Sequence, residues 1–160
     1  MKNRKIIFGT ITALLPLVFL VLVEFSLWIF GAYAQQPLFL EKTIDDRAVL
    51  QINSEVGERY FDKRTMPVPN LYPQVFSANK NENIFRIFCL GGSSTAGFPY
   101  EMTVPFPKQL DLMLSNAYPD KTFEVINMGL SAINSFTIAD WIPDILDQDP
   151  DLILLYMGHN

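Results

Sequence analysis

Hydrophobic and polar positions divide the chain into three stretches, and the first of them is almost entirely apolar. Residues 6–23 carry no charge and are mostly Ile, Leu, Val and Phe, and after Glu24 the apolar run resumes as far as Tyr33. At about 1.5 Å per residue, about 20 helical residues cross the hydrocarbon core of a bilayer. The pattern therefore predicts a transmembrane helix within residues 1–34, with residues 6–33 in contact with lipid.

The charges around this helix predict its orientation. Three basic residues lie within the first five positions, and the positive-inside rule places such an end in the cytoplasm. A rival interpretation takes Ala-Tyr-Ala at residues 32–34 as a signal-peptidase site, but the apolar stretch is longer than a typical signal-peptide core. We favour an uncleaved, single-pass signal anchor. Both interpretations place the rest of the chain outside the cytoplasm, in the periplasm or the extracellular space.

The second stretch, residues 35–83, is polar and mixed. Pro67, Pro69 and Pro73 interrupt any helix there and favour extended or turn conformations. This stretch is interpreted as a juxtamembrane connector that packs loosely on the edge of the following domain.

The third stretch, residues 84–160, alternates between two hydrophobic patterns. Short apolar runs typical of strands occur at 84–90, 123–127 and 151–156. Between them, apolar residues recur at helical spacing over 106–117 and 138–146, and Pro143 predicts a kink or a restart in the second helix. Alternating strands and helices predict an α/β domain whose parallel sheet is covered on both faces.

Composition excludes several classes of function. The 160 residues include 12 Lys+Arg against 17 Asp+Glu, a net charge of −5, which argues against binding to nucleic acid. One cysteine and one histidine exclude a Cys-based zinc site and a His-rich metal site. No cofactor and no metal are therefore expected.

Candidate chemistry gathers where the predicted strands end. Residues 91–97 form a Gly/Ser-rich loop that is neither a P-loop nor a G-x-S-x-G elbow. The second strand leads into Gly129 and the third into Asn160. The carboxyl ends of parallel strands share one edge of a sheet, so a serine, a glycine amide and an asparagine amide meet there. That is the inventory of a nucleophile with an oxyanion hole, although these residues alone leave Ser93, Ser94 and a plain turn as alternatives.

Three segments resemble the sequence blocks of the SGNH (GDSL-like) hydrolase superfamily, membrane-anchored bacterial type. Residues 88–97 are similar to the first block, 125–131 to the second and 150–160 to the third. The resemblance implies a partial flavodoxin-like, three-layer α/β/α domain over residues 84–160. It implies that Ser93 is the nucleophile and a backbone oxyanion donor, that Gly129 is a second backbone donor and that Asn160 donates from its side chain.

The resemblance also implies an activity. The protein would be a membrane-anchored, extracytoplasmic serine ester hydrolase, acting as an esterase or as an acyltransferase on envelope glycans or lipids. The family's base is a histidine in a late Asp-x-x-His block, and His159 does not match that block. We therefore expect an N-terminal fragment, inactive alone. The alternative is a non-catalytic membrane-anchored binding or scaffold protein with a degenerate SGNH fold.

Overall fold

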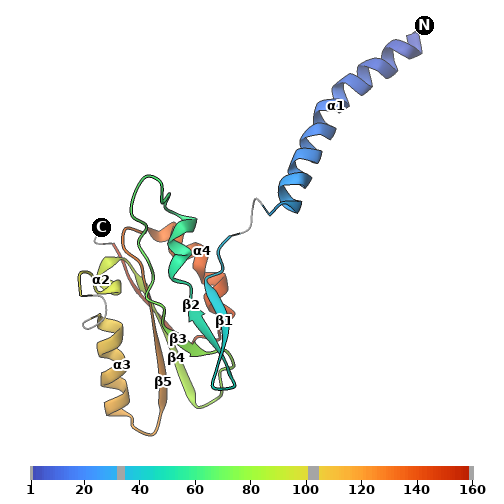
Figure 1. The fold of residues 1–160 in the computed structure, drawn as a ribbon. Helices are drawn as coiled ribbons and strands as arrows, with labels where there is room; N and C mark the ends of the chain where they lie inside the picture. The colour runs from blue at the N-terminus through green and yellow to red at the C-terminus, as the bar shows by residue number, and fades with distance from the viewer. Residues whose placement is uncertain (1, 32–34, 101–104, 159–160) are drawn as a thin grey trace. The chain divides into compact units, whose positions relative to one another are not determined.

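The computed structural model describes residues 2–31, 35–100 and 105–158 (Figure 1). The chain forms two compact units, Met1–Gln35 and Gln36–Asn160. The candidate cleavage motif at residues 32–34 lies outside the described residues.

The first unit is one helix, α1 (Lys2–Ile29). By length and composition it is apolar enough to cross a membrane, which confirms the predicted apolar helix. Inside it the Thr12 hydroxyl donates to the Phe8 carbonyl at 2.9 Å, and the Ser26 hydroxyl donates to the Leu22 carbonyl at 2.7 Å. These bonds give both hydroxyls a partner within the helix, as a lipid environment requires. The crossing itself and its orientation stay predictions.

The second unit begins with a small antiparallel sheet that the sequence analysis did not predict. It contains β1 (Phe39–Ile44), β2 (Arg47–Ile52) and β3 (Val75–Ser77), in the order β1-β2-β3. Asp45 and Asp46 join the first two strands with φ of 47° and 60°, the left-handed pair that a two-residue hairpin turn requires. The 3-10 helix η1 (Ser54–Arg59) follows β2.

This small sheet corrects the expectation that residues 35–83 pack loosely. Its buried side chains join one hydrophobic cluster with the domain that follows, and Phe76 meets Phe88 edge to face at 5.7 Å between ring centroids. Leu50 and Ile52, two residues apart on β2, both point into this cluster. Every second side chain at the end of β2 is buried, and this gives the strand one apolar face. The overall polar, proline-containing composition of residues 35–83 does not reveal that face.

The main sheet is parallel, as predicted. It consists of β4 (Ile84–Gly91), β5 (Thr122–Gly129) and β6 (Leu152–Tyr156), in the order β5-β4-β6 with β4 central. Gly91 pairs in register with Gly129 on one side and with Tyr156 on the other. The three strands therefore end level, at one edge of the sheet.

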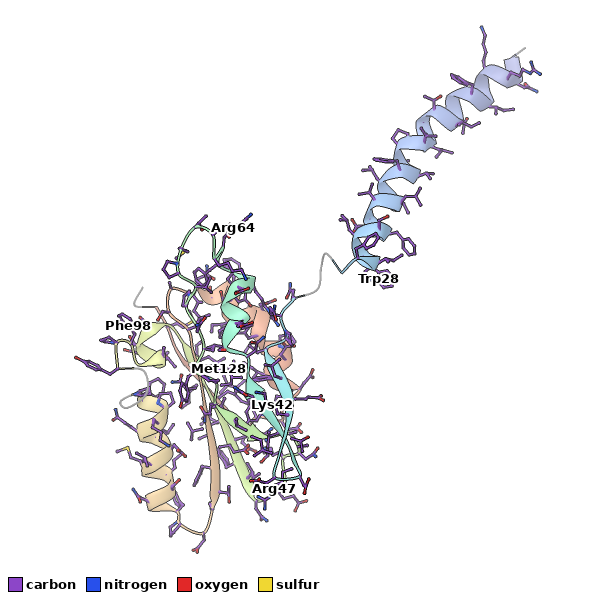
Figure 2. The ribbon with its side chains drawn as sticks, in the orientation of Figure 1. Trp28, Lys42, Arg47, Arg64, Phe98 and Met128 are labelled. Atoms are coloured by element: carbon purple, nitrogen blue, oxygen red, sulfur yellow. The ribbon has the colours of Figure 1, made fainter. Side chains whose placement is uncertain are left out.

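Helices cover both faces of the parallel sheet, as predicted. On one face, α3 (Phe106–Ala117) packs through Phe106, Leu110 and Leu114, and Figure 1 shows it running beside β5. On the other face, α4 (Ser135–Leu146) and the antiparallel sheet share the core that contains Met128, labelled in Figure 2. The predicted restart does not occur: α4 is one helix through Pro143, capped at its first turn by the Asn134 side chain and packed into the core through Trp141 and Ile145.

Arg86 joins the two sheets and the turn before β6. Its guanidinium is buried, forms an ion pair with Glu124 (Nε–Oε2 2.8 Å) and lies 5.0 Å from the centroid of the Phe76 ring. The same group donates to the carbonyls of Gln148 at 2.6 Å and Ser77 at 2.7 Å. A buried arginine thus has a partner in each neighbouring element, as an interior charge requires.

The contacts of Asp151, just before β6, lead us to expect that the domain loses stability in acid. Partial burial acts to raise the pKa of Asp151, but hydrogen bonds from Lys80 Nζ and the Arg86 N–H outweigh it and lower the pKa below 3.8. A carboxyl with a lowered folded-state pKa stabilises the fold above its unfolded pKa, and this contribution disappears as pH falls through the folded value. We expect Asp151→Asn to lower the urea midpoint at pH 7 and to lower it less at about pH 3, where part of this contribution has already been lost. An equal loss at both pH values would contradict the assignment.

Candidate active site

The loop after β4 closes into a short helix that carries Ser93. This helix, α2 (Ser93–Ala96), begins directly after Gly92 and ends at Gly97, whose φ of 88° lies in the left-handed region. The Gly97 N–H donates to the Ser93 carbonyl at 2.9 Å. Ser93 is half-buried, and within the described part of the chain no hydrogen bond engages its hydroxyl. Its oxygen is therefore available to a ligand at the carboxyl edge of the central strand.

Two contacts hold α2 against the sheet. Thr95 is fully buried, and its hydroxyl lies 3.5 Å from the Tyr156 carbonyl at the end of β6. A Cβ on Gly91 would lie 2.1 Å from Thr95 Oγ1, closer than atoms can approach. Thr95 and Gly91 therefore belong to the scaffold that positions Ser93.

Gly129, the predicted second donor, packs directly on α2. A Cβ at this position would lie 2.1 Å from the Ala96 nitrogen and 2.5 Å from the Thr95 carbonyl carbon. Only a glycine allows the end of β5 to approach the helix backbone this closely. The structure thus brings the end of β5 and the helix that carries Ser93 into contact.

The amide of Gly129 has a partner that sequence reasoning missed. Its N–H donates to Asn127 Oδ1 at 2.9 Å, in a buried setting. An asparagine side chain that bonds the backbone two residues ahead is a familiar turn device, so the Asn-x-Gly spacing was the available signal. An oxyanion would have to share this N–H with Asn127 or displace the Asn127 oxygen.

The loop after β5 contains a second feature that the sequence did not reveal. Leu130 N–H donates to the Gly91 carbonyl at 3.0 Å, and the chain then turns at Ala132, which is exposed and has a φ of 61°. A non-glycine residue in this region costs roughly 1–2 kcal/mol. Such strained positions cluster at functional sites, and this one follows a strand end at the same sheet edge as Ser93.

The remaining predicted residues, His159 and Asn160, lie outside the described residues. The last described position is Gly158, two residues beyond the end of β6. Because Tyr156 pairs with Gly91, the chain leaves β6 at the same edge of the sheet as Ser93 and Gly129. The oxyanion role of Asn160 stays a prediction.

Aromatic side chains project beside α2. Phe98 and Tyr100 follow Gly97 and are mostly exposed, and Figure 2 shows Phe98 directed away from the rest of the domain. An apolar surface therefore adjoins the serine at the open edge of the sheet.

Two further ionisable side chains of the domain, Cys89 and Tyr60, have strongly raised pKa values. Burial raises the pKa of the Cys89 thiol to about 12, so it stays protonated and is a poor nucleophile. Burial, and then the hydrogen bond to Asp140, raise the pKa of Tyr60 to about 12. The same hydrogen bond connects the end of η1 to α4. Among the described residues, no group of three or more His, Cys, Asp or Glu side chains is placed to hold a metal ion.

Comparison with known proteins adds no assignment. No protein-family model, no curated protein and no solved structure matches the chain.

Proposed function

We propose that the protein is a membrane-anchored, extracytoplasmic serine ester hydrolase or acyltransferase of the SGNH type, with Ser93 as its nucleophile. One observation carries the proposal: Ser93 opens a short helix directly after the central parallel strand, and among the described residues nothing engages its hydroxyl. A flavodoxin-like topology is part of the same proposal, supported by the order β5-β4-β6 and by helices on both faces.

The proposed reaction is acyl transfer through a covalent intermediate. Ser93 Oγ attacks the ester carbonyl while a general base removes its proton, and the carbonyl π electrons move onto the oxygen. The backbone N–H groups of Ser93 and Gly129 and the Asn160 side chain would stabilise this oxyanion. Collapse expels the alcohol, which takes a proton from the conjugate acid of the base. Water then attacks the acyl-serine in hydrolysis, or a sugar hydroxyl attacks it in transfer.

The base is assigned, on the SGNH pattern, to a histidine of an Asp-x-x-His block rather than to His159. Without such a base a serine hydroxyl is a weak nucleophile. The substrate class is an acyl or acetyl ester on an envelope glycan or lipid, because α1 would hold the domain at the membrane surface.

One observation favours a second candidate, a membrane-anchored domain that binds without catalysis. The Gly129 N–H, which the first proposal gives to an oxyanion, already donates to Asn127 Oδ1. A site whose donor is satisfied within the protein stabilises developing charge less than one held open for it.

Covalent labelling of the serine separates the two candidates. Membranes from cells that produce the native protein would be treated with a fluorescent fluorophosphonate, which captures activated serines. We expect wild-type protein to be labelled and Ser93→Ala to lose the label by at least about a hundredfold, because the attacking oxygen is gone.

Ser94→Ala is the matched control, since the neighbouring hydroxyl lies on the same short helix and is exposed. It should keep the wild-type labelling rate. Labelling that persists in Ser93→Ala would rule out Ser93 as the nucleophile, and an unlabelled wild-type protein would favour the non-catalytic candidate.

A further inference from the structure

A pocket of about 190 Å³ opens between the outer edge of β5 and the first turn of α3. It lies beside the candidate active site and is not used by the chemistry proposed for Ser93. The volume is below the roughly 300–1,000 Å³ of drug-sized sites, so the pocket accommodates one small unit of a ligand. The residues that matter for its chemistry are Tyr72, Gln74, Pro105, Lys108, Asp111 and Asn127.

The side chain of Gln74 forms one wall of the pocket. Its amide makes the two backbone hydrogen bonds that a neighbouring strand would make with the edge of β5. Its Oε1 accepts the Asn127 N–H at 3.0 Å, and its Nε2 donates to the Val125 carbonyl at 2.7 Å. These two bonds fasten the segment before β3 to the free edge of β5. The pocket is therefore a preformed part of the fold.

Asn127 supplies an unfilled donor to this pocket. Only 8% of the residue is exposed. Its Oδ1 accepts the Gly129 N–H at 2.9 Å, and because that contact requires an acceptor, the orientation of the amide is determined. The Nδ2 group has no partner among the described residues. Among the described residues, Trp141 Nε1 is the buried side-chain atom without a partner, so Asn127 Nδ2 is in contact with solvent at the pocket, where a ligand oxygen can replace water as its acceptor.

The opposite wall of the pocket, on α3, carries a positively charged donor, Lys108, and a negatively charged acceptor, Asp111. Lys108 Nζ and Asp111 Oδ2 lie 3.0 Å apart on adjacent turns of α3. The wall is thus electrically neutral, yet it presents N–H groups and carboxylate oxygens side by side. The Tyr72 ring and two prolines complete an apolar lining.

This set of groups excludes most ligand classes. The Lys108–Asp111 ion pair has no net charge, so the wall gives no net attraction to an anion or to a cation. An acyl chain would leave Asn127 Nδ2 unpaired and would desolvate the ion pair, which is costly. A hydroxyl both donates and accepts, so neighbouring hydroxyls on a small ring satisfy Asp111, Lys108 and Asn127 together.

We propose that this pocket binds a neutral polyhydroxylated ring, a sugar unit of a glycan. The role of this sugar in catalysis rests on the function proposed for Ser93. If the sugar belongs to the substrate, the ester that Ser93 attacks is carried by a glycan and not by a lipid. Two contacts connect the pocket to the Ser93 helix. Gly129, which orients Asn127, packs on Ala96, and a Cβ on Gly97 would lie 2.8 Å from Pro105 Cβ in the pocket wall. A sugar held here lies next to α2.

The test is a binding measurement that does not depend on catalysis. The full chain with Ser93→Ala, in lipid nanodiscs, would be titrated with maltotriose, cellotriose and chitotriose by ligand-observed saturation-transfer NMR. Hexanoate and inorganic phosphate serve as the acyl and anionic probes. We expect at least one trisaccharide to bind with a Kd below about 10 mM, and neither comparison probe to bind at that concentration.

Pocket variants locate the binding. Lys108→Met removes a donor and keeps the aliphatic stem, and Asn127→Asp keeps the oxygen that accepts from Gly129 while it removes the Nδ2 donor. Each should weaken the bound trisaccharide by about tenfold. Lys121→Met, at an exposed lysine before β5 that does not line the pocket, should leave the Kd within about twofold.

The outcomes separate this inference from the proposed function. No trisaccharide binding, preferential binding of hexanoate or phosphate, or unchanged affinity in both pocket variants would overturn the sugar site. Phosphonate labelling of Ser93 is read independently in the native protein. Sugar binding without labelling supports a glycan-binding, non-catalytic domain, whereas labelling without sugar binding overturns only the inference drawn here.

Discussion

Arg86→Met destabilises the domain by about 3–5 kcal/mol, the loss typical of removing one partner from a buried ion pair. Glu124, whose side chain is 14% exposed, keeps its charge but loses its cation. The carbonyls of Gln148 and Ser77 lose their donors in the same substitution. Urea unfolding of the full chain in detergent measures the effect. In a Trp28→Phe background, Trp141 is the single fluorescent tryptophan of the chain.

The matched control is Arg64→Met, which removes an arginine from an exposed ion pair. Arg64 is 86% exposed and contacts Asp62 at 2.9 Å, and exposed pairs of this kind contribute at most about 1 kcal/mol. Adding Glu124→Leu to Arg86→Met should recover part of the lost stability, because the uncompensated carboxylate is then gone. Equal losses in the Arg86 and Arg64 variants would show that the buried guanidinium is not what joins the two sheets.

Gly129→Ala is expected to displace α2 and to inactivate the serine. The added Cβ would lie 2.1 Å from the Ala96 nitrogen and 2.5 Å from the Thr95 carbonyl carbon. Both atoms are backbone, so no side-chain rotation relieves the clash, and overpacking of this kind costs about 1–3 kcal/mol or more. A shift of about 1 Å in a reacting group reduces rates by roughly a hundredfold. We expect phosphonate labelling of Ser93 to slow by about that factor.

Gly9→Ala provides the comparison, since a Cβ at Gly9 meets nothing within 4 Å. It should label at the wild-type rate. A Gly129→Ala protein with wild-type labelling and an unchanged urea midpoint would mean that the end of β5 does not position the serine helix.

The parallel sheet was predictable because its central strand β4 and the second half of β5 are buried on both faces. The run at residues 84–90 is apolar apart from Arg86, which is typical of a buried strand, and the intervening helices show their period clearly. The antiparallel sheet was missed because it presents only one apolar face, and its inward residues, Leu50 and Ile52, are separated by polar ones. Its third strand has three residues, which is too few to show any period.

The candidate site was predictable at the level of strand ends, but not at the level of hydrogen bonds. Placing Ser93 and Gly129 at one edge required only the rule that parallel strands end together. The bond between Asn127 and the Gly129 N–H, and the left-handed backbone at Ala132, depend on local geometry that residue types leave open. Side chains that act on neighbouring backbone have no long-range pattern in the sequence to reveal them.

The Gln74 amide has a consequence for how the parallel sheet can be extended. It occupies the hydrogen-bonding positions of Val125 and Asn127 on the outer side of β5. An incoming strand would have to break both bonds to pair there, so this side of the sheet is protected against strand addition. The side chains of Leu155 and Tyr156 on β6 are largely exposed at the opposite side. Growth of the sheet is thereby directed towards β6, whichever polypeptide supplies the next strand.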